Sequence, residues 1–289
     1  MAKFNCNFIS YTLVRAVDIT VIIPSPTIPE AMMANIDVLK SMSSATGNSP
    51  EESLFRDQIR NIETPKHKKK EKYPVLYLLH GYGNNHATWS GYTNVELYAE
   101  ERNIAVVMIS AENKSYVNHE SGDRFYDFIQ NELPDFICGM FPVSERPEDT
   151  FIAGLSMGGF GTFINAFNQP DKYAAMGAFS AAVSLNPTLL AGGKDKPVEE
   201  CNDPRKLAQK RKEEKKALPK IFIACGDKDA LYEDNLLFKD ELVSMKQDVT
   251  WVSAPGYGHE WRFWNEIVEV FLDWLPRSDF YAEKGKRRI

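Results

Sequence analysis

The sequence predicts an α/β protein with a mostly parallel central sheet and helices on both of its faces. From residue 73 onward, short continuous apolar runs alternate with helix-like segments. A continuous apolar run is typical of a strand that is buried on both faces. The chain of 289 residues is 43% hydrophobic and 26% charged, which is the composition of a globular protein with a large core.

The predicted elements follow one another in a regular order. Strands are expected within 8–23, where two short ones pair, and at 74–79, 104–109, 150–153, 220–224 and 249–252. Helices are expected at 95–102, at 123–141, from 158 onward, at 234–245 and at 267–275. Asp123 is placed to cap the start of its helix. Alternating strands and helices favour one parallel sheet.

Two segments interrupt this alternation within what we expect to be a single domain over 1–289. The first, at about 25–72, opens with several prolines and ends in a basic run, and we interpret it as a surface insertion. The second, at about 185–218, contains a charge-dense helix at 203–216. We expect this second segment to form a lid-like excursion over the sheet edge.

Composition argues against several classes of function. The net charge of −6 disfavours general binding to nucleic acid or to anionic membranes. The four cysteines form no C-x-x-C pair and no H-E-x-x-H motif occurs, so we expect neither a metal nor a cofactor. No apolar run approaches the ~20 residues that span a bilayer, and no signal core opens the chain, so a cytoplasmic location is expected. The sequence leaves open whether the protein forms a homo-oligomer.

The strongest chemical signal is a G-x-S-x-G motif centred on Ser156. A predicted strand ends at Ala153 and a helix follows, which is the setting of the nucleophile elbow in α/β-hydrolases. The strained elbow pushes the serine hydroxyl clear of the sheet, and glycine is needed at 154 and 158 because side chains there would collide. The sequence therefore predicts Ser156 as a nucleophile.

A serine nucleophile needs a base, and the chain offers only five histidines. The α/β-hydrolase order along the chain is serine, acid, histidine, and His259 alone follows Ser156. An acid must lie between them to orient the imidazole. Asp227 and Asp229 both follow the predicted strand at 220–224. We prefer Asp229, because it lies further into the loop, and expect Asp227 to make turn hydrogen bonds.

Acyl transfer also needs hydrogen-bond donors for the oxyanion that forms on the substrate. The loop at 80–85 follows the first buried strand, so the backbone N–H groups of Tyr82 and Met157 are assigned to this role. Aromatic residues cluster near the motifs, and four of them are candidates for binding substrate: Trp89, Tyr116, Tyr257 and Trp261.

Four ordered segments resemble those of the Putative esterase family, which includes tributyrin esterases, S-formylglutathione hydrolases, and feruloyl and acetylxylan esterases. These segments are 73–84, 154–161, 225–235 and 258–264. The tributyrin esterase branch is the most similar, because it shares the Leu-Tyr-Glu-Asp-Asn stretch and the His-Glu-Trp ending. The resemblance implies an α/β-hydrolase fold and places the triad on Ser156, Asp229 and His259.

The expected function is a serine carboxylesterase that hydrolyses short-chain acyl esters, with acetyl-sugar and feruloyl esters among the candidates, through an acyl-enzyme. Its partner is then a small-molecule ester substrate. Three alternatives stay open on the same fold: an acyltransferase, a thioesterase such as an S-formylglutathione hydrolase, and a non-catalytic binding protein. The His-Glu-Trp ending differs from the Asp-His-Ser-Tyr pattern of S-formylglutathione hydrolases, which disfavours that thioester.

Overall fold

The computed structural model describes residues 1–25, 72–190, 194 and 198–278. Contacts group Ala2–Pro24 with Lys72–Ile289 into one unit, which contains all the helices and strands named below. The other unit consists of Met1 and Ser25–Glu71. It coincides with the expected insertion at 25–72, whose residues 26–71 lie outside the described part of the chain.

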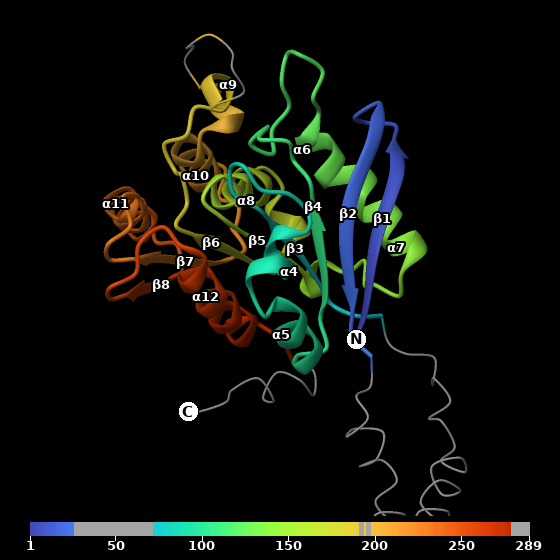
Figure 1. Ribbon diagram of the computed structural model, residues 1–289. Coiled ribbons are helices and arrows are strands. Elements are labelled where there is room, and N and C mark those ends of the chain that lie inside the picture. Colours follow the sequence, from blue (N-terminus) through green and yellow to red (C-terminus); the bar gives the residue numbers. More distant parts are fainter. Residues whose placement is uncertain (26–71, 191–193, 195–197, 279–289) are drawn as a thin grey trace, which may run out of the picture. The chain divides into compact units, whose positions relative to one another are not determined.

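Eight strands form one sheet in the order β1-β2-β4-β3-β5-β6-β7-β8 (Figure 1). β1 and β2 form an antiparallel hairpin, β2 is antiparallel to β4, and all the later pairs are parallel. The strands are β1 (Ala2–Ser10), β2 (Arg15–Ile23), β3 (Val75–Leu79), β4 (Ala105–Ile109), β5 (Thr150–Leu155), β6 (Ala175–Phe179), β7 (Lys220–Gly226) and β8 (Val249–Ala254). The predicted α/β class is confirmed.

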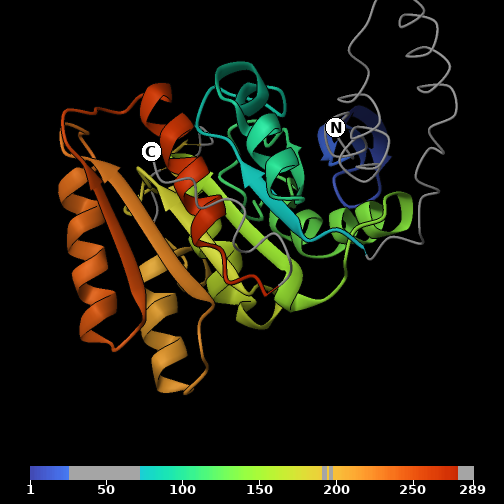
Figure 2. The ribbon, with the colours of Figure 1, turned by 90° about the horizontal axis from the view of Figure 1, so that it is seen from below.

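Helices cover both faces of the sheet, with α5 and α12 on one side and α7 and α8 on the other (Figure 2). The helices are α4 (Thr88–Tyr92), α5 (Val95–Glu101), α6 (Phe125–Asp127), α7 (Leu133–Met140), α8 (Met157–Asn168), α9 (Pro187–Leu190), α10 (Pro204–Glu213), α11 (Tyr232–Ser244) and α12 (Trp261–Trp274). A π-helical turn, Phe128–Glu132, joins α6 to α7. Short 3₁₀ turns lie at Pro147–Asp149, Pro170–Lys172 and Glu200–Asn202.

Each face of the sheet has its own apolar core. On the face of α7, α8, α10 and α11, fully buried rings such as Phe163 and Phe238 pack edge to face with centroids 5.0 Å apart. On the face of α4, α5 and α12, Phe179 and Phe271 pack in the same way at 5.6 Å. The parallel strands are therefore buried on both sides, as their continuous apolar runs predict.

Two elements extend further toward the N-terminus than predicted. β1 begins at Ala2 and not at Phe8. It is an edge strand with one face open to solvent, and exposed polar residues such as Asn5 and Asn7 interrupt the apolar pattern by which a buried strand is recognised. α12 begins at Trp261 rather than at 267. Its first turn follows the loop that carries His259, so the helix starts immediately after the candidate base.

The expected cap at Asp123 is wrong. The helical segment starts at Phe125, and its N-cap residue is Arg124, which makes no capping hydrogen bond through its side chain. The carboxylate of Asp123 instead pairs with Arg15 at 2.7 Å and with Lys114 at 3.1 Å. These cations offer stronger charge-assisted bonds than a helix terminus does.

The charge-dense helix of the excursion at 185–218 is α10, and Asp203 caps it by accepting from the backbone N–H groups of Arg205 and Lys206. Leu207 is buried, and the Arg211 guanidinium donates to the carbonyl of Phe167 in α8 at 2.7 Å. α10 is thereby fixed against α8. Residues 191–193 and 195–197 of the excursion lie outside the described part.

Candidate active site

Ser156 lies at the turn between β5 and α8, with φ 55° and ψ −115°. This is the left-handed half of the φ range, which is strained for any residue except glycine. Two backbone hydrogen bonds to the end of β6 and the residues after it hold the turn: Ser156 N–H donates to Phe179 O at 2.9 Å, and Ala182 N–H donates to Ser156 O at 3.1 Å. The elbow predicted from the sequence is present.

Three glycines allow the chain to approach this elbow closely. A Cβ atom on Gly154 would lie 2.5 Å from the Gly158 backbone, and one on Gly158 would lie 2.5 Å from Leu79 O. A Cβ atom on Gly81 would lie 2.5 Å from the Leu155 side chain and 3.4 Å from Ser156 Cβ. Larger residues at 154 and 158 would meet backbone atoms, so the sequence-based reason for glycine there is confirmed.

The His259 imidazole contacts both Ser156 and Asp229. Its Nε2 lies 3.0 Å from Ser156 Oγ, and its Nδ1 lies 2.8 Å from Asp229 Oδ2. An ionised carboxylate only accepts, so Nδ1 carries the proton and the neutral Nε2 accepts from the serine hydroxyl. The Trp264 ring packs edge to face on the imidazole, with ring centroids 4.9 Å apart.

Asp229 lies in the loop after β7, and its side chain is fully buried. Its second oxygen accepts from Leu231 N–H at 2.9 Å. Burial by itself raises the pKa of Asp229, but hydrogen bonds from His259, from the Leu231 N–H and from Ser180 outweigh burial and hold this pKa below its ordinary value. The carboxylate is therefore ionised at neutral pH.

Asp227, the alternative acid, faces the turn after β8. Its Oδ1 accepts from Gly256 N–H at 2.7 Å, and its own N–H donates to Ala254 O at 3.0 Å. The expectation that Asp227 makes turn hydrogen bonds is confirmed. These bonds fix the turn that leads to His259.

The loop after β3 lies beside the elbow and is held by His80. Ala111 N–H donates to His80 Nε2 at 2.9 Å, so the neutral ring carries its proton on Nδ1 and donates to Gly81 O at 2.7 Å. Burial lowers the pKa of His80 to about 4, although the bond to Gly81 opposes this shift. Tyr82 follows directly on this loop, and Met157 begins α8 on the other side of Ser156.

The Met157 N–H belongs to the first turn of α8, where amides have no acceptor within the helix. In the loop after β3, the Gly83 amide donates to Asn113 Oδ1 at 2.7 Å, the Asn84 amide to Gly81 O at 3.3 Å and the Asn85 amide to Thr88 Oγ1 at 2.8 Å. Met157 thus follows Ser156 directly at the start of α8, and Tyr82 follows Gly81, whose Cβ position lies 3.4 Å from Ser156 Cβ.

Two of the four aromatic candidates do not line a site. Trp89 and Tyr116 are both fully buried. The Trp89 indole donates to Leu79 O at 3.0 Å, and the Tyr116 hydroxyl donates to His80 O at 2.7 Å. Both polar groups are used inside the protein, so these two residues support the strand and loop beneath the site and are not open to a substrate.

The other two candidates are partly exposed near His259. Trp261 stacks on Tyr92, with ring centroids 5.1 Å apart and planes 17° from parallel, and packs edge to face on Trp264 at 5.1 Å. Tyr257 donates its hydroxyl to Glu266 at 2.5 Å. Trp261 therefore belongs to an aromatic group that continues to the His259 ring, whereas the Tyr257 hydroxyl is tied to α12.

The remaining histidines are accounted for, within the described residues, by other contacts. His80 holds its loop, His86 pairs with Thr20 at 2.8 Å, and His119 Nε2 lies 2.9 Å from Lys114 O. His67 lies outside the described residues. Among the described histidines, His259 is thus the one in contact with Ser156.

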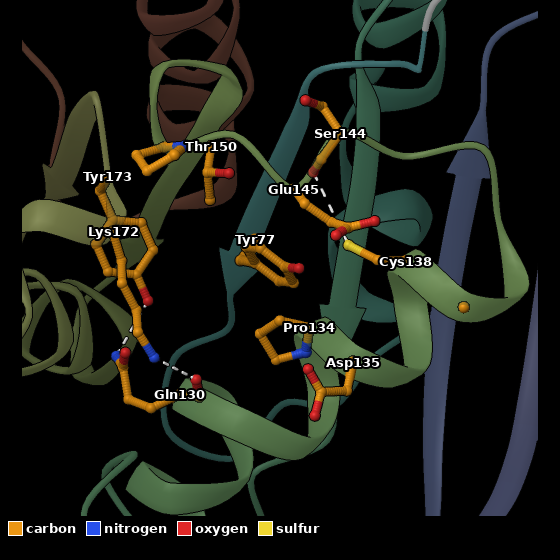
Figure 3. A pocket seen from close by; sticks show the side chains of 12 residues that line it. Tyr77, Gln130, Pro134, Asp135, Cys138, Ser144, Glu145, Thr150, Lys172 and Tyr173 are labelled. Carbon is orange, nitrogen blue, oxygen red and sulfur yellow. Dashed lines mark hydrogen bonds between the residues drawn. The ribbon is translucent and has the colours of Figure 1, made fainter.

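A pocket of about 560 Å³ lies at the amino ends of β5 and β6, away from the carboxyl edge that carries Ser156 (Figure 3). Figure 3 shows Tyr77 projecting into it, with Lys172 on one side and Asp135 and Glu145 on the other. Its lining contains no histidine. The contact between Ser156 and His259 lies at the opposite edge of the sheet, beyond the carboxyl ends of β5 and β8.

Two further observations concern the described residues as a whole. No group of three or more His, Cys, Asp or Glu side chains is placed to hold a metal ion in this part of the chain. None of its helices has both the length and the apolar character needed to cross a bilayer.

Two residues beside the site were missed in the sequence reasoning. Ser180 follows β6, and its hydroxyl helps to lower the pKa of Asp229. Trp264 in α12 contacts His259. Ser180 follows a strand that the sequence did not predict, so nothing in the sequence marked this serine as functional. Trp264 lies three residues after Trp261, and this spacing indicated only that the two rings share one face of a helix.

Fold and site together define an enzyme of the serine hydrolase class with an α/β-hydrolase fold. The chain belongs to the Putative esterase family, whose model matches residues 53–282, and acts on carboxylic ester bonds.

Individual relatives agree with this assignment. An acetyl esterase of Caldicellulosiruptor saccharolyticus is 29% identical over 226 residues, which cover 72% of this chain and 85% of that protein. The structure of a fluorophosphonate-binding serine hydrolase, FphF of Staphylococcus aureus, is 27% identical with a TM-score of 0.76, covering 96% of this chain and 99% of that one. The S-formylglutathione hydrolase FrmB of Staphylococcus aureus is 29% identical with a TM-score of 0.72, over 95% and 96% of the two chains.

Proposed function

We propose that the protein is a carboxylesterase that hydrolyses short-chain acyl esters through a triad of Ser156, His259 and Asp229. The observation that carries the proposal is the hydrogen-bonded line from Ser156 Oγ to His259 Nε2 at 3.0 Å and from His259 Nδ1 to Asp229 Oδ2 at 2.8 Å. A nucleophile, a base and an orienting acid in this geometry are the parts that acyl transfer requires.

The reaction has two halves. His259 takes the proton of Ser156 as the oxygen attacks the ester carbonyl, and Asp229 stabilises the imidazolium that forms. The N–H groups of Tyr82 and Met157 bind the oxyanion, the alcohol leaves with the proton from His259, and an acyl-enzyme remains. Water, activated by the same imidazole, then releases the acid.

A short acyl group is favoured because a relative that covers 72% of this chain carries the name acetyl esterase. A thioesterase acting on S-formylglutathione is the second candidate, since FrmB is equally similar in sequence at 29% identity. Both substrates would use the same acyl-enzyme chemistry. They differ in the leaving group, so the discrimination between them lies in the alcohol or thiol side of the site.

The first experiment replaces the nucleophile. Ser156→Ala removes the attacking oxygen, and hydrolysis of p-nitrophenyl acetate should fall by a factor of about 10⁴ or more, toward the rate left to binding and oxyanion contacts. Ser244→Ala, an exposed serine at the end of α11, is the matched control and should keep full activity. Wild-type turnover in Ser156→Ala would end the proposal.

The second experiment identifies the acyl and leaving groups. The values of kcat/KM for p-nitrophenyl acetate, butyrate and octanoate should decrease in this order, and acetylated sugars should be hydrolysed. An S-formylglutathione kcat/KM above that of every oxygen ester would replace the esterase assignment by the thioesterase one. A preference for octanoate would contradict the short-chain proposal.

A further inference from the structure

A buried serine lies between the elbow and the candidate acid. Ser180 follows β6, is fully buried and has φ 44°. Its N–H donates to Ala224 O in β7 at 2.8 Å, while the residue before it, Phe179, accepts from Ser156 N–H. The segment 179–182 is therefore bonded both to the strand that precedes the acid and to the turn that carries the nucleophile.

A second set of bonds prevents this segment from moving. The Asn235 side chain in α11 accepts from Ala181 N–H at 3.1 Å and donates to Ala181 O at 2.8 Å. A Cβ atom on Gly159 would lie 2.7 Å from Ala181 Cβ, so α8 packs directly on the segment. Ser180 is thus held rigidly in a backbone conformation that serine rarely adopts.

The hydroxyl of Ser180 has partners that determine its direction. Trp264 Nε1 lies 3.2 Å from Ser180 Oγ, and an indole N–H can only donate. The serine oxygen therefore accepts from Trp264. Its own proton stays available for an acceptor, and the hydroxyl of Ser180 helps to lower the pKa of the Asp229 carboxyl, so the two groups are close in space.

We propose that Ser180 and Trp264 are positioning residues for the acid of the triad, in a hydrogen-bonded line from Trp264 Nε1 through Ser180 Oγ to Asp229. This inference rests on the proposed function. A buried carboxylate needs several donors to stay ionised and fixed in place. Asp229 Oδ2 accepts from His259 and Oδ1 accepts from Leu231 N–H. In this proposal, the Ser180 hydroxyl is the further donor to the carboxylate.

Trp264 acts on the triad from two sides. Its N–H orients Ser180, and its ring packs edge to face on the His259 imidazole. One side chain of α12 thereby fixes the acid through Ser180 and the base by direct contact. The neighbouring thiol of Cys225 lies 4.0 Å from Ser180 Oγ, and burial above all raises its pKa to about 12, so it stays neutral beside the carboxylate.

The test removes the Ser180 hydroxyl in two ways. Ser180→Ala keeps the Cβ atom, whereas Ser180→Gly relieves the strain of a positive φ. A hydrogen bond to a charged group is worth enough to lower kcat for p-nitrophenyl acetate about tenfold to a hundredfold in both variants. KM should stay unchanged, because the line contacts the triad and not the substrate. Wild-type kcat in Ser180→Gly would show that only the backbone matters and would overturn the proposal.

Trp264→Phe gives an independent test, because phenylalanine keeps the ring against His259 and removes the N–H. It should lower kcat in the wild-type background and have little further effect in Ser180→Ala, since the N–H acts through Ser180. Additive effects of the two substitutions would overturn the proposal. Trp274→Phe on the same helix, whose indole donates to Thr250 Oγ1 at 2.9 Å, is the matched control and should keep wild-type kcat.

A fluorophosphonate probe separates this inference from the proposed function. Each variant is titrated with an alkyl fluorophosphonate, which counts the folded sites and reports the reactivity of Ser156 without an ester. Labelling of Ser156 should occur in all variants, and should be slower by the factor seen in kcat when Ser180 loses its hydroxyl. A wild-type labelling rate in Ser180→Gly would sink the inference alone, whereas wild-type protein that is not labelled at Ser156 would sink the proposed function.

Ser10→Ala controls for loss of stability. Ser10 is also a buried serine that donates to a buried carboxylate, at 2.7 Å to Glu132, but it lies in the hairpin at the sheet edge. This variant should lose stability and keep its kcat per labelled site. A fall in kcat in this variant as large as that in Ser180→Ala would show that general destabilisation explains the effect, and would contradict the positioning role.

Discussion

At the scale of single residues, a neutral buried histidine holds the loop that precedes Tyr82. His80 is 1% exposed, accepts from Ala111 N–H and donates to Gly81 O. A charged imidazole could not accept the first of these bonds. Burial lowers the pKa of this ring to about 4, so the loop keeps its conformation over the whole neutral range.

This histidine predicts a loss of stability in mild acid. An ordinary histidine in the unfolded chain takes up its proton near ~6.5, whereas His80 in the folded protein stays neutral down to about 4. The unfolded state therefore binds more protons in this window. The stability that the neutral ring provides is complete above ~6.5 and is lost as pH falls toward 4, by about 3 kcal/mol.

The measurement is urea unfolding at about pH 7 and about pH 4.5, in the wild type and in His80→Gln, with the free energy of unfolding extrapolated to water. The variant should be less stable at neutral pH but should lose less stability on acidification. The same decrease with pH in both proteins would show that His80 is not the responsible group.

Much of the candidate site could be predicted from the sequence, because chain order and local motifs limit the choices. Ser156 and His259 follow from a strand-to-helix motif and from the order of five histidines. The choice of Asp229 over Asp227 agrees with the contacts of both carboxylates. Ser180 was not predictable, since its role arises from bonds to residues far away in the chain.

At the scale of elements, a buried glutamate joins the N-terminal hairpin to the helical segment that covers it. Glu132, in the π-helical turn before α7, accepts from Ser10 Oγ at 2.7 Å and from the N–H groups of Tyr11 and Thr12 at 3.0 and 2.9 Å. Burial raises the pKa of Glu132, but these bonds outweigh it and lower the pKa. The turn between β1 and β2 is thus attached to the sheet's covering layer through one carboxylate.

Glu132→Ala should therefore lower the free energy of unfolding by about 3 kcal/mol, because it leaves a buried hydroxyl and two N–H groups without their acceptor. Glu148→Ala is the control: its side chain is 65% exposed and lies 3.7 Å from Arg146, so the change should be within about 1 kcal/mol. Chemical denaturation of the three proteins is the check. Equal stability of Glu132→Ala and the wild type would contradict the role of this carboxylate.

Elements that escaped prediction share a physical cause. β6, Ala175–Phe179, is made of small residues and Met and Phe rather than β-branched ones, so its intrinsic preference for a strand is weak. Its Gly177 is needed because a Cβ atom there would lie 2.7 Å from the Phe271 ring of α12. Helix α4 is a single short turn without a capping side chain. Tertiary packing determines the conformation of both elements, and the local sequence pattern does not reveal that packing.

At the scale of the whole molecule, the sheet brings together side chains that are far apart in the sequence. Ser156, Ser180, Asp229 and His259 follow β5, β6, β7 and β8, which are consecutive neighbours in the sheet. Parallel strands expose their carboxyl ends at one edge, so all four side chains meet there. The continuous apolar runs form the buried parallel strands, and the ends of these strands determine where the site lies.

The central claim is that Ser156 becomes acylated, and trapping that intermediate tests it most directly. The protein is mixed with excess p-nitrophenyl acetate and quenched in acid within milliseconds, and its intact and peptide masses are measured. The account predicts one acetyl group, on the peptide that contains Ser156, and none there in Ser156→Ala. An acetyl group on another residue during turnover, with Ser156 unmodified, would contradict the claim.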